Sequence, residues 1–295
     1  MTISEQQLDT WSKQGPTAQF TSTYNTIGNV LKDGASPYAG QSFQVFLQGS
    51  YKNDTNVYGD SDVDIVIRLD TIYYNDQSFL KDEEKARFVA QWVSASYSLA
   101  DFKSSVTAWL QKKFPGCITP GNKAIFVKGN DSRRDADVVV CAKLRRFYSF
   151  PAYGQPTQAE GICFFLPDGI TRIENFPSLH SDNTTTKHQA TNQWFKPTVR
   201  VFKNLRNALV KSGTIPDGLA PSYFIEGLLY NVPPDRYGGT KQQNFRDVLD
   251  YLLNADRNKF VCANEQFYLL RNSPVTWPAD NCAAFLNAAT QYWNS

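Results

Sequence analysis

The stretch QGSYKNDTNVYGDSDVDIVI, residues 48–67, carries the most specific pattern in this chain. An apolar run ends at a Gly-Ser pair, a polar loop of eleven residues follows, and a second apolar run begins at Asp62 and Asp64. Successive side chains of a strand point to opposite faces, so the two carboxylates share one face while Val63 turns into the core. The stretch therefore predicts two strands, with paired acidic groups at the start of the second.

Paired carboxylates at this spacing favour a divalent cation. They repel each other by about 1–4 kcal/mol, depending on the effective dielectric. Mg²⁺ removes that repulsion, and it usually takes one or two carboxylates together with phosphate oxygens. An Asp-x-Asp pair on its own is more commonly a solvated strand end, so the metal interpretation depends on the residues that precede it.

The Gly-Ser pair is a suitable phosphate contact. Gly49 has no Cβ, so a phosphate can approach its backbone closely, and Ser50 adds a hydroxyl donor. Gly-Ser alone is usually only a turn. Followed by the polar loop and the Asp-x-Asp pair, it is far more specific. Gln48, Gly49 and Ser50 are predicted to contact a nucleotide.

A two-metal site generally has a third carboxylate. The segment RRDADVVVCA offers Asp135 and Asp137 at the start of another apolar strand. Asp137 directly precedes the valine run, where the strand would hold it rigidly, and is the residue chosen. Asp135 is interpreted as a turn or salt-bridge residue beside the two arginines.

Composition excludes several classes of protein. The 295 residues carry 30 basic and 28 acidic side chains, a net charge of +2, so a phosphate or nucleic-acid contact must come from local clustering. No apolar run of membrane-spanning length and no signal-like N-terminus is visible, which predicts a soluble, cytoplasmic protein. The five cysteines are widely spaced with no Cys-x-x-Cys pair, so neither a zinc site nor a disulfide framework is expected.

Periodicity divides the chain near residue 180. The first part is predicted to be a mixed α/β core, residues 1–180, and the second a helical lobe, residues 181–295. The predicted strands are 42–48, 63–69, 122–129, 135–147 and a hairpin over 161–177. The predicted helices are 4–13, 17–32, one long segment 82–114, and then 182–194, 197–211, 221–230, 241–253 and 281–293.

These motifs in combination identify a family. LQGSYKNDTNVYGDSDVDIVIRL followed by DADVVVC resembles the DNA polymerase β-type nucleotidyltransferases. With ATNQWFKPTVRVFKNLRN and GLAPSYFIEGLLYNVP, the chain more closely resembles the bacterial CD-NTases related to cyclic GMP-AMP synthase and DncV. It is most similar to the clade E enzymes (CdnE) of CBASS antiphage operons, and the likeness covers nearly the whole chain.

The resemblance implies a catalytic, metal-binding triad of Asp62, Asp64 and Asp137 that holds two Mg²⁺ ions, with Mn²⁺ as an alternative. It implies that one site joins two nucleoside triphosphates into a linear intermediate and then closes the ring. A separate CBASS effector would read the product. We expect a monomer without an obligatory nucleic-acid partner.

In the helical lobe, the helix after Pro197 has an apolar stripe and an opposite basic face. A solvated surface is the simpler explanation of that face. The resemblance implies that Lys203 reaches the triphosphate, that Ser222 binds a phosphate, and that Tyr223 stacks on a base. The stripe comprises Val199, Phe202, Leu205 and Leu209, and the basic face comprises Lys196, Arg200, Lys203 and Asn207.

Base selection is predicted at Asn175, which matches the position of an asparagine in the pyrimidine-selecting clade E enzymes. Its carboxamide offers one acceptor and one donor, complementary to N3–H and a neighbouring carbonyl of uracil. UTP and ATP are the expected substrates, and cyclic UMP-AMP or cyclic di-UMP the expected product. Two alternatives stay open: a nucleotidyltransferase that modifies RNA or protein, and a catalytically silent nucleotide sensor.

Overall fold

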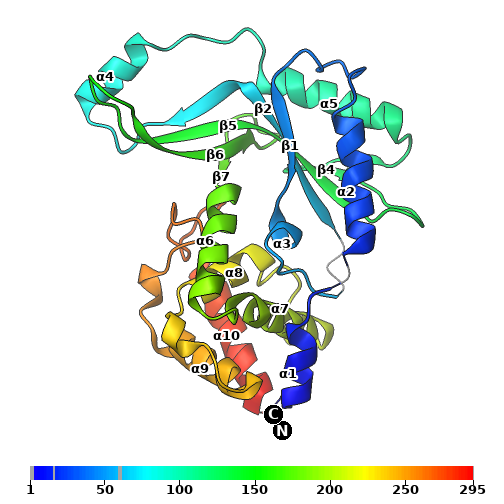
Figure 1. Ribbon diagram of the computed structural model, residues 1–295, viewed down its shortest axis with the longest axis vertical. Helices are drawn as coiled ribbons and strands as arrows, with labels where there is room; N and C mark the ends of the chain where they lie inside the picture. The colour runs from blue at the N-terminus through cyan, green and yellow to red at the C-terminus, as the bar shows by residue number, and fades with distance from the viewer. Residues whose placement is uncertain (1–2, 16, 59–61, 295) are drawn as a thin grey trace. The chain divides into compact units, whose positions relative to one another are not determined.

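The predicted strands, together with a short strand at residues 118–120 that was not predicted, form one mixed sheet of seven strands (Figure 1). A computed structural model describes residues 3–15, 17–58 and 62–294. The order along the sheet is β1-β2-β5-β4-β3, with β6 on the later part of β5 and β7 on β6. The strands are β1 (Phe43–Leu47), β2 (Val63–Asp76), β3 (Ile118–Pro120), β4 (Ile125–Val127), β5 (Ala136–Ser149), β6 (Thr157–Phe165) and β7 (Arg172–Asn175).

The central pair of the sheet is β2 with β5, the two 14-residue strands, and it is parallel. The other pairs are antiparallel: β1 lies along the free edge of β2, and β4 and β6 share the second edge of β5. The continuous apolar runs in β2 and β5 predict burial on both faces. Ile65 and Val138, which lie opposite each other, are fully buried.

Two helices pack on the sheet near the start of its long strands: α2 (Ala18–Leu31) on β1 and β2, and α5 (Leu99–Lys113) on β5 (Figure 1). The aromatic rings of Tyr38, Phe43 and Phe102 meet there with centroids 5.4–6.2 Å apart. The indole N–H of Trp109 donates to the carbonyl of Val30 at 2.9 Å and joins the two helices.

The long helix predicted over 82–114 is in fact two helices, α4 (Asp82–Ala90) and α5. The intervening residues 91–98 include Val93 and three serines, which are poor helix formers. Ser98 then caps α5 by accepting a hydrogen bond from the backbone N–H of Asp101, whose carboxylate bonds back to the N–H of Ser98. The serine-rich segment therefore ends one helix, and the cap starts the next.

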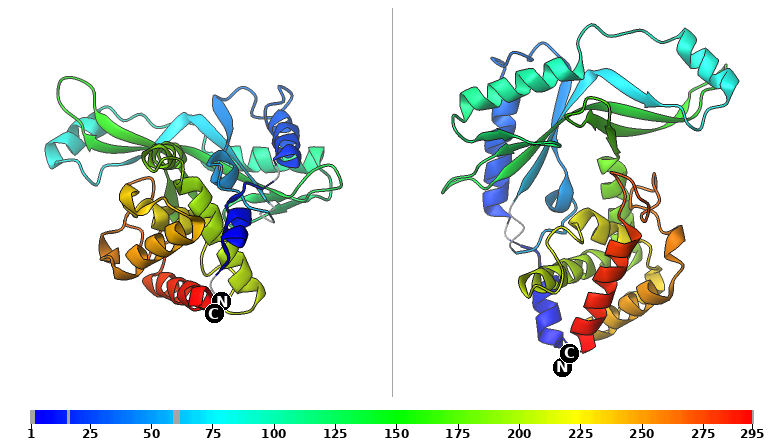
Figure 2. Two further views of the ribbon diagram at one scale, coloured as in Figure 1. Left: turned by 60° about the horizontal axis from the view of Figure 1, so that its bottom comes forward. Right: turned by 180° about the vertical axis from the view of Figure 1, so that it is seen from behind.

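The helices of the C-terminal half pack around a second apolar core (Figure 2). The predicted stripe of α7 is buried in it, with Val199, Phe202 and Leu205 fully inaccessible. No helix within the described ranges is both long and apolar enough to cross a bilayer. The helices are α6 (Pro177–Ala190), α7 (Phe195–Lys211), α8 (Ser222–Tyr230), α9 (Lys241–Asn254) and α10 (Ala279–Asn294), joined by the short 3₁₀ turns η1 (Pro234–Arg236) and η2 (Arg257–Lys259).

The compact units differ from the linear division predicted at residue 180. The helical unit comprises Met1–Pro16, Gly49–Asp60 and Pro177–Ser295, and the sheet unit comprises Thr17–Gln48 and Ser61–Phe176. The N-terminal helix α1 (Glu5–Ser12) belongs with the helices because its apolar side chains join their core. The segment after β1 belongs there because its polar side chains bond to α7 and α8. Amphipathic periodicity does not reveal such long-range partners.

Candidate active site

The three predicted aspartates lie in the sheet unit, at the start of the parallel pair. Asp64 in β2 is the register partner of Asp137 in β5, and neighbouring strands lie about 4.7–4.9 Å apart. Asp62 immediately precedes β2 and is exposed, whereas Val63 is fully buried, as the alternation predicts. The pKa of Asp137 is raised, chiefly by burial and then by the negative charges of Asp62 and Asp135. The structure thus brings Asp62, Asp64 and Asp137 to one end of the sheet.

This donor set fits a hard divalent cation. All three side chains offer carboxylate oxygens, the ligands that Mg²⁺ prefers. The pKa of Asp137 is raised first by burial and then by the charges of Asp62 and Asp135, and a bound cation would offset both effects. In the portion of the chain that the structure describes, no three His, Cys, Asp or Glu side chains are gathered closely enough to form a ligand shell. The three carboxylates lie at the same end of the sheet without forming a ligand shell, so a bound cation would have to draw them closer together.

Asp135 is engaged elsewhere. Its Oδ1 accepts a 2.6 Å hydrogen bond from the backbone N–H of Gly129, across the turn that leads into β5. A Cβ on Gly129 would lie 2.4 Å from the carbonyl oxygen of Arg133, so the turn requires glycine for close approach. This turn role agrees with the choice of Asp137 over Asp135.

The Gly-Ser pair follows β1 after one intervening residue, Gln48. At the end of that strand, the backbone N–H of Gln48 donates to the carbonyl of Asp64 at 3.1 Å, which ties it to the acidic strand. Gln48 Oε1 is buried and has no partner among the residues that are described. Gly49 has a φ of 72°, which glycine adopts at little cost. Where a simple turn was predicted, residues Gly49–Lys52 form the short helix α3.

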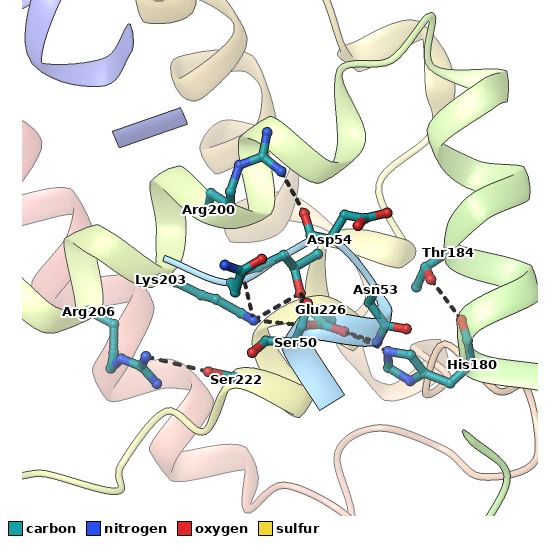
Figure 3. Close-up of polar contacts among 12 residues, drawn as sticks. Ser50, Asn53, Asp54, His180, Thr184, Arg200, Lys203, Arg206, Ser222 and Glu226 are labelled. Atoms are coloured by element: carbon teal, nitrogen blue, oxygen red, sulfur yellow. Dashed lines mark hydrogen bonds and ion pairs between the residues drawn. The ribbon is translucent and has the colours of Figure 1, made fainter. Parts of the chain in front are cut away.

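A buried carboxylate that the sequence analysis missed, Glu226 of α8, organises the helical unit (Figure 3). Its Oε1 accepts hydrogen bonds from Thr55 Oγ1 at 2.5 Å and Lys203 Nζ at 2.8 Å. Its Oε2 accepts one from Asn53 Nδ2 at 3.0 Å and lies 2.7 Å from His180 Nε2. Burial alone would raise the pKa of Glu226, yet Lys203 and His180 outweigh it and hold the pKa far below its ordinary value. Glu226 therefore stays ionised.

The network around Glu226 fixes the loop that follows Ser50. Thr55, bound to Glu226, also donates its backbone N–H to the carbonyl of Ser50 at 2.9 Å. Lys203 Nζ adds bonds to the carbonyl and hydroxyl oxygens of Thr55, at 3.2 and 3.1 Å. The sequence did contain a signal for this network, because Glu226 is a lone carboxylate in the apolar run FIEGLL. A carboxylate buried in such a run must be paired.

The basic face of α7 is not the solvated surface that the simpler explanation predicted, and Lys203 shows this most clearly. Its side chain is fully buried, and its ammonium group binds Glu226 and Thr55 rather than facing open solvent. The basic face of α7 is also largely occupied: Lys196 pairs with Asp54 at 3.0 Å, and Arg200 donates to the carbonyls of Ser12 and Asp54. These partners come from distant segments, so helical periodicity alone suggested a solvated face.

Ser222 and Tyr223 lie at the start of α8, as the motif predicted. Ser222 Oγ accepts a long hydrogen bond, 3.4 Å, from the guanidinium of Arg206 (Figure 3). The ring of Tyr223 stacks on the imidazole of His180, with centroids 5.0 Å apart and an angle of 26°. Its hydroxyl accepts from Asn264 Nδ2 at 2.9 Å. The tyrosine is therefore held by contacts on one ring face and at its tip.

Asn175 ends β7 in the sheet unit and is partly buried. Its Oδ1 accepts a 2.8 Å hydrogen bond from the backbone N–H of Phe176. A Cβ on Gly161 would lie 2.6 Å from the carbonyl oxygen of Asn175, so this close strand contact requires glycine. The carboxamide is thus oriented by local backbone, with the second lone pair of Oδ1 left for another donor.

His188 of α6 lies beside the basic face of α7. Its Nδ1 accepts a 3.3 Å hydrogen bond from the backbone N–H of Lys196. The pKa of His188 is lowered to about 4, first by burial and then by the charges of Lys196 and Arg200, against the opposing effect of Asp54. The imidazole is therefore neutral in the folded protein near neutral pH.

Known proteins match this chain over its full length. Residues 182–294 match the family of the cGAS/DncV-like nucleotidyltransferase C-terminal helical domain. The cyclic UMP-AMP synthase of Rhodothermus marinus is 38% identical, over 99% of this chain and 98% of the relative. The cyclic dipurine nucleotide synthase of Elizabethkingia meningoseptica is 36% identical, over 94% of each. The structure of the Rhodothermus CdnE with Apcpp and Upnpp superposes with a TM-score of 0.87, over 99% of this chain and 97% of that chain.

This chain thus combines a mixed sheet that has acidic groups at one end with a C-terminal helical domain. These relatives match it over nearly their whole length. The chain belongs to the cGAS/DncV-like nucleotidyltransferases, the CD-NTases, and among them to the CdnE clade.

Replacing Glu226 with Gln should destabilise the helical unit, because it leaves the ammonium of Lys203 buried without a counter-charge. Breaking a buried ion pair in this way costs about 3–5 kcal/mol. We expect that loss in the free energy of unfolding, measured by urea denaturation. The double variant Lys203→Met with Glu226→Gln should recover most of it. Equal stability of the wild type and Glu226→Gln would contradict the assigned role.

His188 should make the protein less stable in mild acid. In the unfolded chain the His188 side chain has an ordinary pKa of about 6.5, whereas in the folded chain its pKa is about 4. Between these pH values the unfolded chain therefore binds a proton that the folded chain does not. This contribution is therefore complete above pH 6.5 and is lost as the pH falls towards 4. Between those values, the stability of the wild type should fall more steeply than that of His188→Gln, measured by denaturation at each pH. Parallel curves would refute the shift.

Proposed function

We propose that this enzyme joins two nucleoside triphosphates into a cyclic dinucleotide that contains uridine and serves as an antiphage signal. The observation that carries the proposal is the register that sets Asp64 beside Asp137, with Asp62 close enough to raise the pKa of Asp137. Full-length relatives named as cyclic UMP-AMP and cyclic dipurine nucleotide synthases support the reaction class. A separate effector would read the product.

The chemistry is two successive phosphoryl transfers. In each, a ribose hydroxyl oxygen bonds to an α-phosphorus, the bond to the leaving pyrophosphate breaks, and the hydroxyl proton must be taken up. Two Mg²⁺ ions held by Asp62, Asp64 and Asp137 would supply acidity at the attacking hydroxyl and neutralise charge on the triphosphate. Asp137 accepts the proton, and burial makes its carboxylate a stronger base than a free aspartate.

Residues of the helical unit would contribute phosphate and base contacts. The hydroxyls of Ser50 and Ser222 donate to phosphate oxygens, and the backbone of Gly49 admits a phosphate because it has no Cβ. Tyr223 would offer a base the ring face that His180 does not cover. Lys203, which the resemblance assigns to the triphosphate, would support these groups by holding Thr55 and Glu226.

Uracil selection rests on Asn175, because relatives of nearly equal identity are named for different bases. The hydrogen bond from Phe176 orients the carboxamide. Its Nδ2 can donate to a uracil carbonyl while the second lone pair of Oδ1 accepts from N3–H. Adenine has an acceptor at N1 where uracil has N3–H, so it cannot make the same pair of bonds.

The aspartates are tested by product analysis. Incubated with equimolar ribonucleoside triphosphates and Mg²⁺, the wild type should yield a phosphatase-resistant cyclic dinucleotide in mass spectrometry. Asp137→Asn should lower its rate of formation by about 10²–10⁴-fold, the contribution of a general base. Asp135→Asn is the matched control and should retain activity, since its side chain can still accept from Gly129. A labelled polymer or polypeptide instead of a small product would favour the alternative transferases.

The base choice is tested separately. Asn175→Ser removes the donor and shortens the side chain, so two hydrogen bonds of about 1 kcal/mol each are lost. We expect the preference of kcat/KM for UTP over ATP to fall by about thirtyfold, since 1.36 kcal/mol corresponds to a factor of ten, with the rate for ATP little changed. An unaltered UTP:ATP product ratio would refute uracil recognition by Asn175 and leave the proposed synthesis intact.

A further inference from the structure

A cavity of about 550 Å³ lies in the sheet unit near the end of β5. Its lining includes Tyr73 of β2, Trp92, Arg145 and Phe147 of β5, and Phe150. Arg145 is eight residues beyond Asp137, which at about 3.3 Å per residue places it roughly 26 Å along the strand. The volume falls within the range of about 300–1,000 Å³ typical of small-molecule sites. The cavity is thus separate from the aspartates.

Aromatic side chains build one wall of the cavity. Phe88 of α4 packs against Phe147 at 5.2 Å and Phe150 at 5.5 Å, measured between ring centroids. Trp92 contacts Phe88 and Tyr73, both at 5.5 Å, and remains 42% exposed. Phe147 is 2% exposed and belongs to the core, whereas Trp92 presents an accessible ring. The wall offers a planar ligand a place to stack.

Arg145 gives this aromatic cavity an uncompensated positive charge. Its guanidinium carbon lies 4.2 Å from the ring centroid of Tyr73, and its Nε is buried without a hydrogen-bond partner among the described residues. Its register partner is Glu160, but that carboxylate is engaged by Arg68 at 2.8 Å and Lys143 at 3.6 Å. The next residue, Arg146, pairs with Asp76 and Glu174.

An unpaired guanidinium stacked on an aromatic ring is well suited to phosphate or carboxylate oxygens. Three carboxamides complete the lining, from Gln91, Gln155 and Gln158. Each offers donor and acceptor atoms that can pair with the edge of a heterocycle. An apolar occupant would leave both the cation and these amides unsatisfied.

We propose that this cavity is a second, non-catalytic site for a small anion that bears a planar heteroaromatic ring, of the size and class of a nucleoside monophosphate. The ring stacks at Trp92, its edge bonds the carboxamides, and the anionic group pairs with Arg145. The proposal goes beyond the synthetic activity and does not depend on it, because none of these residues belongs to the acidic end of the sheet.

The test measures binding of AMP, CMP, GMP and UMP, one at a time, to the full chain in EDTA by calorimetry. At least one should bind with a Kd below 1 mM, whereas its nucleoside and inorganic phosphate should each bind at least tenfold more weakly. Arg145→Gln should weaken the monophosphate at least tenfold. Arg246→Gln, which removes an exposed arginine of the helical unit, is the matched control and should bind as the wild type does.

A second measurement locates the ligand. Photolabelling with the azido derivative of the tightest monophosphate should mark peptides within 88–98 or 150–158, and Arg145→Gln should abolish the mark. Should that variant fail to fold, Trp92→Leu, which alters a partly exposed ring, should reduce the labelling instead. The proposal is overturned if no monophosphate binds, if Arg145→Gln binds like the wild type, or if the label falls only near Gly49 or Ser222.

Discussion

The parallel pairing of β2 with β5 decides where this enzyme holds its acidic groups. One register aligns Asp64 with Asp137 and at the same time buries Val63 and Ile65 beside Ala136 and Val138. A shift of β5 by one residue along β2 would place Asp137 opposite Val63 or Ile65, so the pairing register enforces the placement of the charges. The carboxylates placed in this way repel one another, and a bound cation would relieve that repulsion. The fold tolerates the repulsion because the carboxylates lie where the strands begin.

A second constraint operates in the helical unit, where a buried ionised glutamate joins four segments. Glu226 receives hydrogen bonds from Asn53 and Thr55 and pairs with His180 and Lys203. Burying these charges is costly unless every partner is in place, so the network accepts few alternative arrangements. The loop behind Ser50 is thereby positioned by α6, α7 and α8, although it is a separate piece of the chain. Local rigidity of this kind suits backbone and hydroxyl groups that bind a phosphate.

Much of the fold was readable from periodicity and capping. The apolar run after Asp62 predicted a buried strand, and the stripe on α7 predicted its buried face, because both depend on local spacing. The placement of Asp62, Asp64 and Asp137 at one end of the sheet was readable too, since each lies where an apolar run begins. The partner of Lys203 was not, because Glu226 lies 23 residues away on another helix. The break between α4 and α5 was not predicted, because the helical pattern on both sides concealed the weak helix formers at residues 91–98. The unpaired charge of Arg145 became visible only once the register showed how Glu160 is engaged.

The proposed synthesis requires Asp64 and Asp137 to bind one divalent cation together. The most direct measurement is anomalous diffraction from crystals grown with Mn²⁺ and a non-hydrolysable UTP analogue. We predict an anomalous peak within about 2.0–2.3 Å of a carboxylate oxygen from each of these two residues, with Asp62 contributing to the same cluster. Well-ordered nucleotide without a peak at this point, or a peak bound by neither residue, would contradict the account.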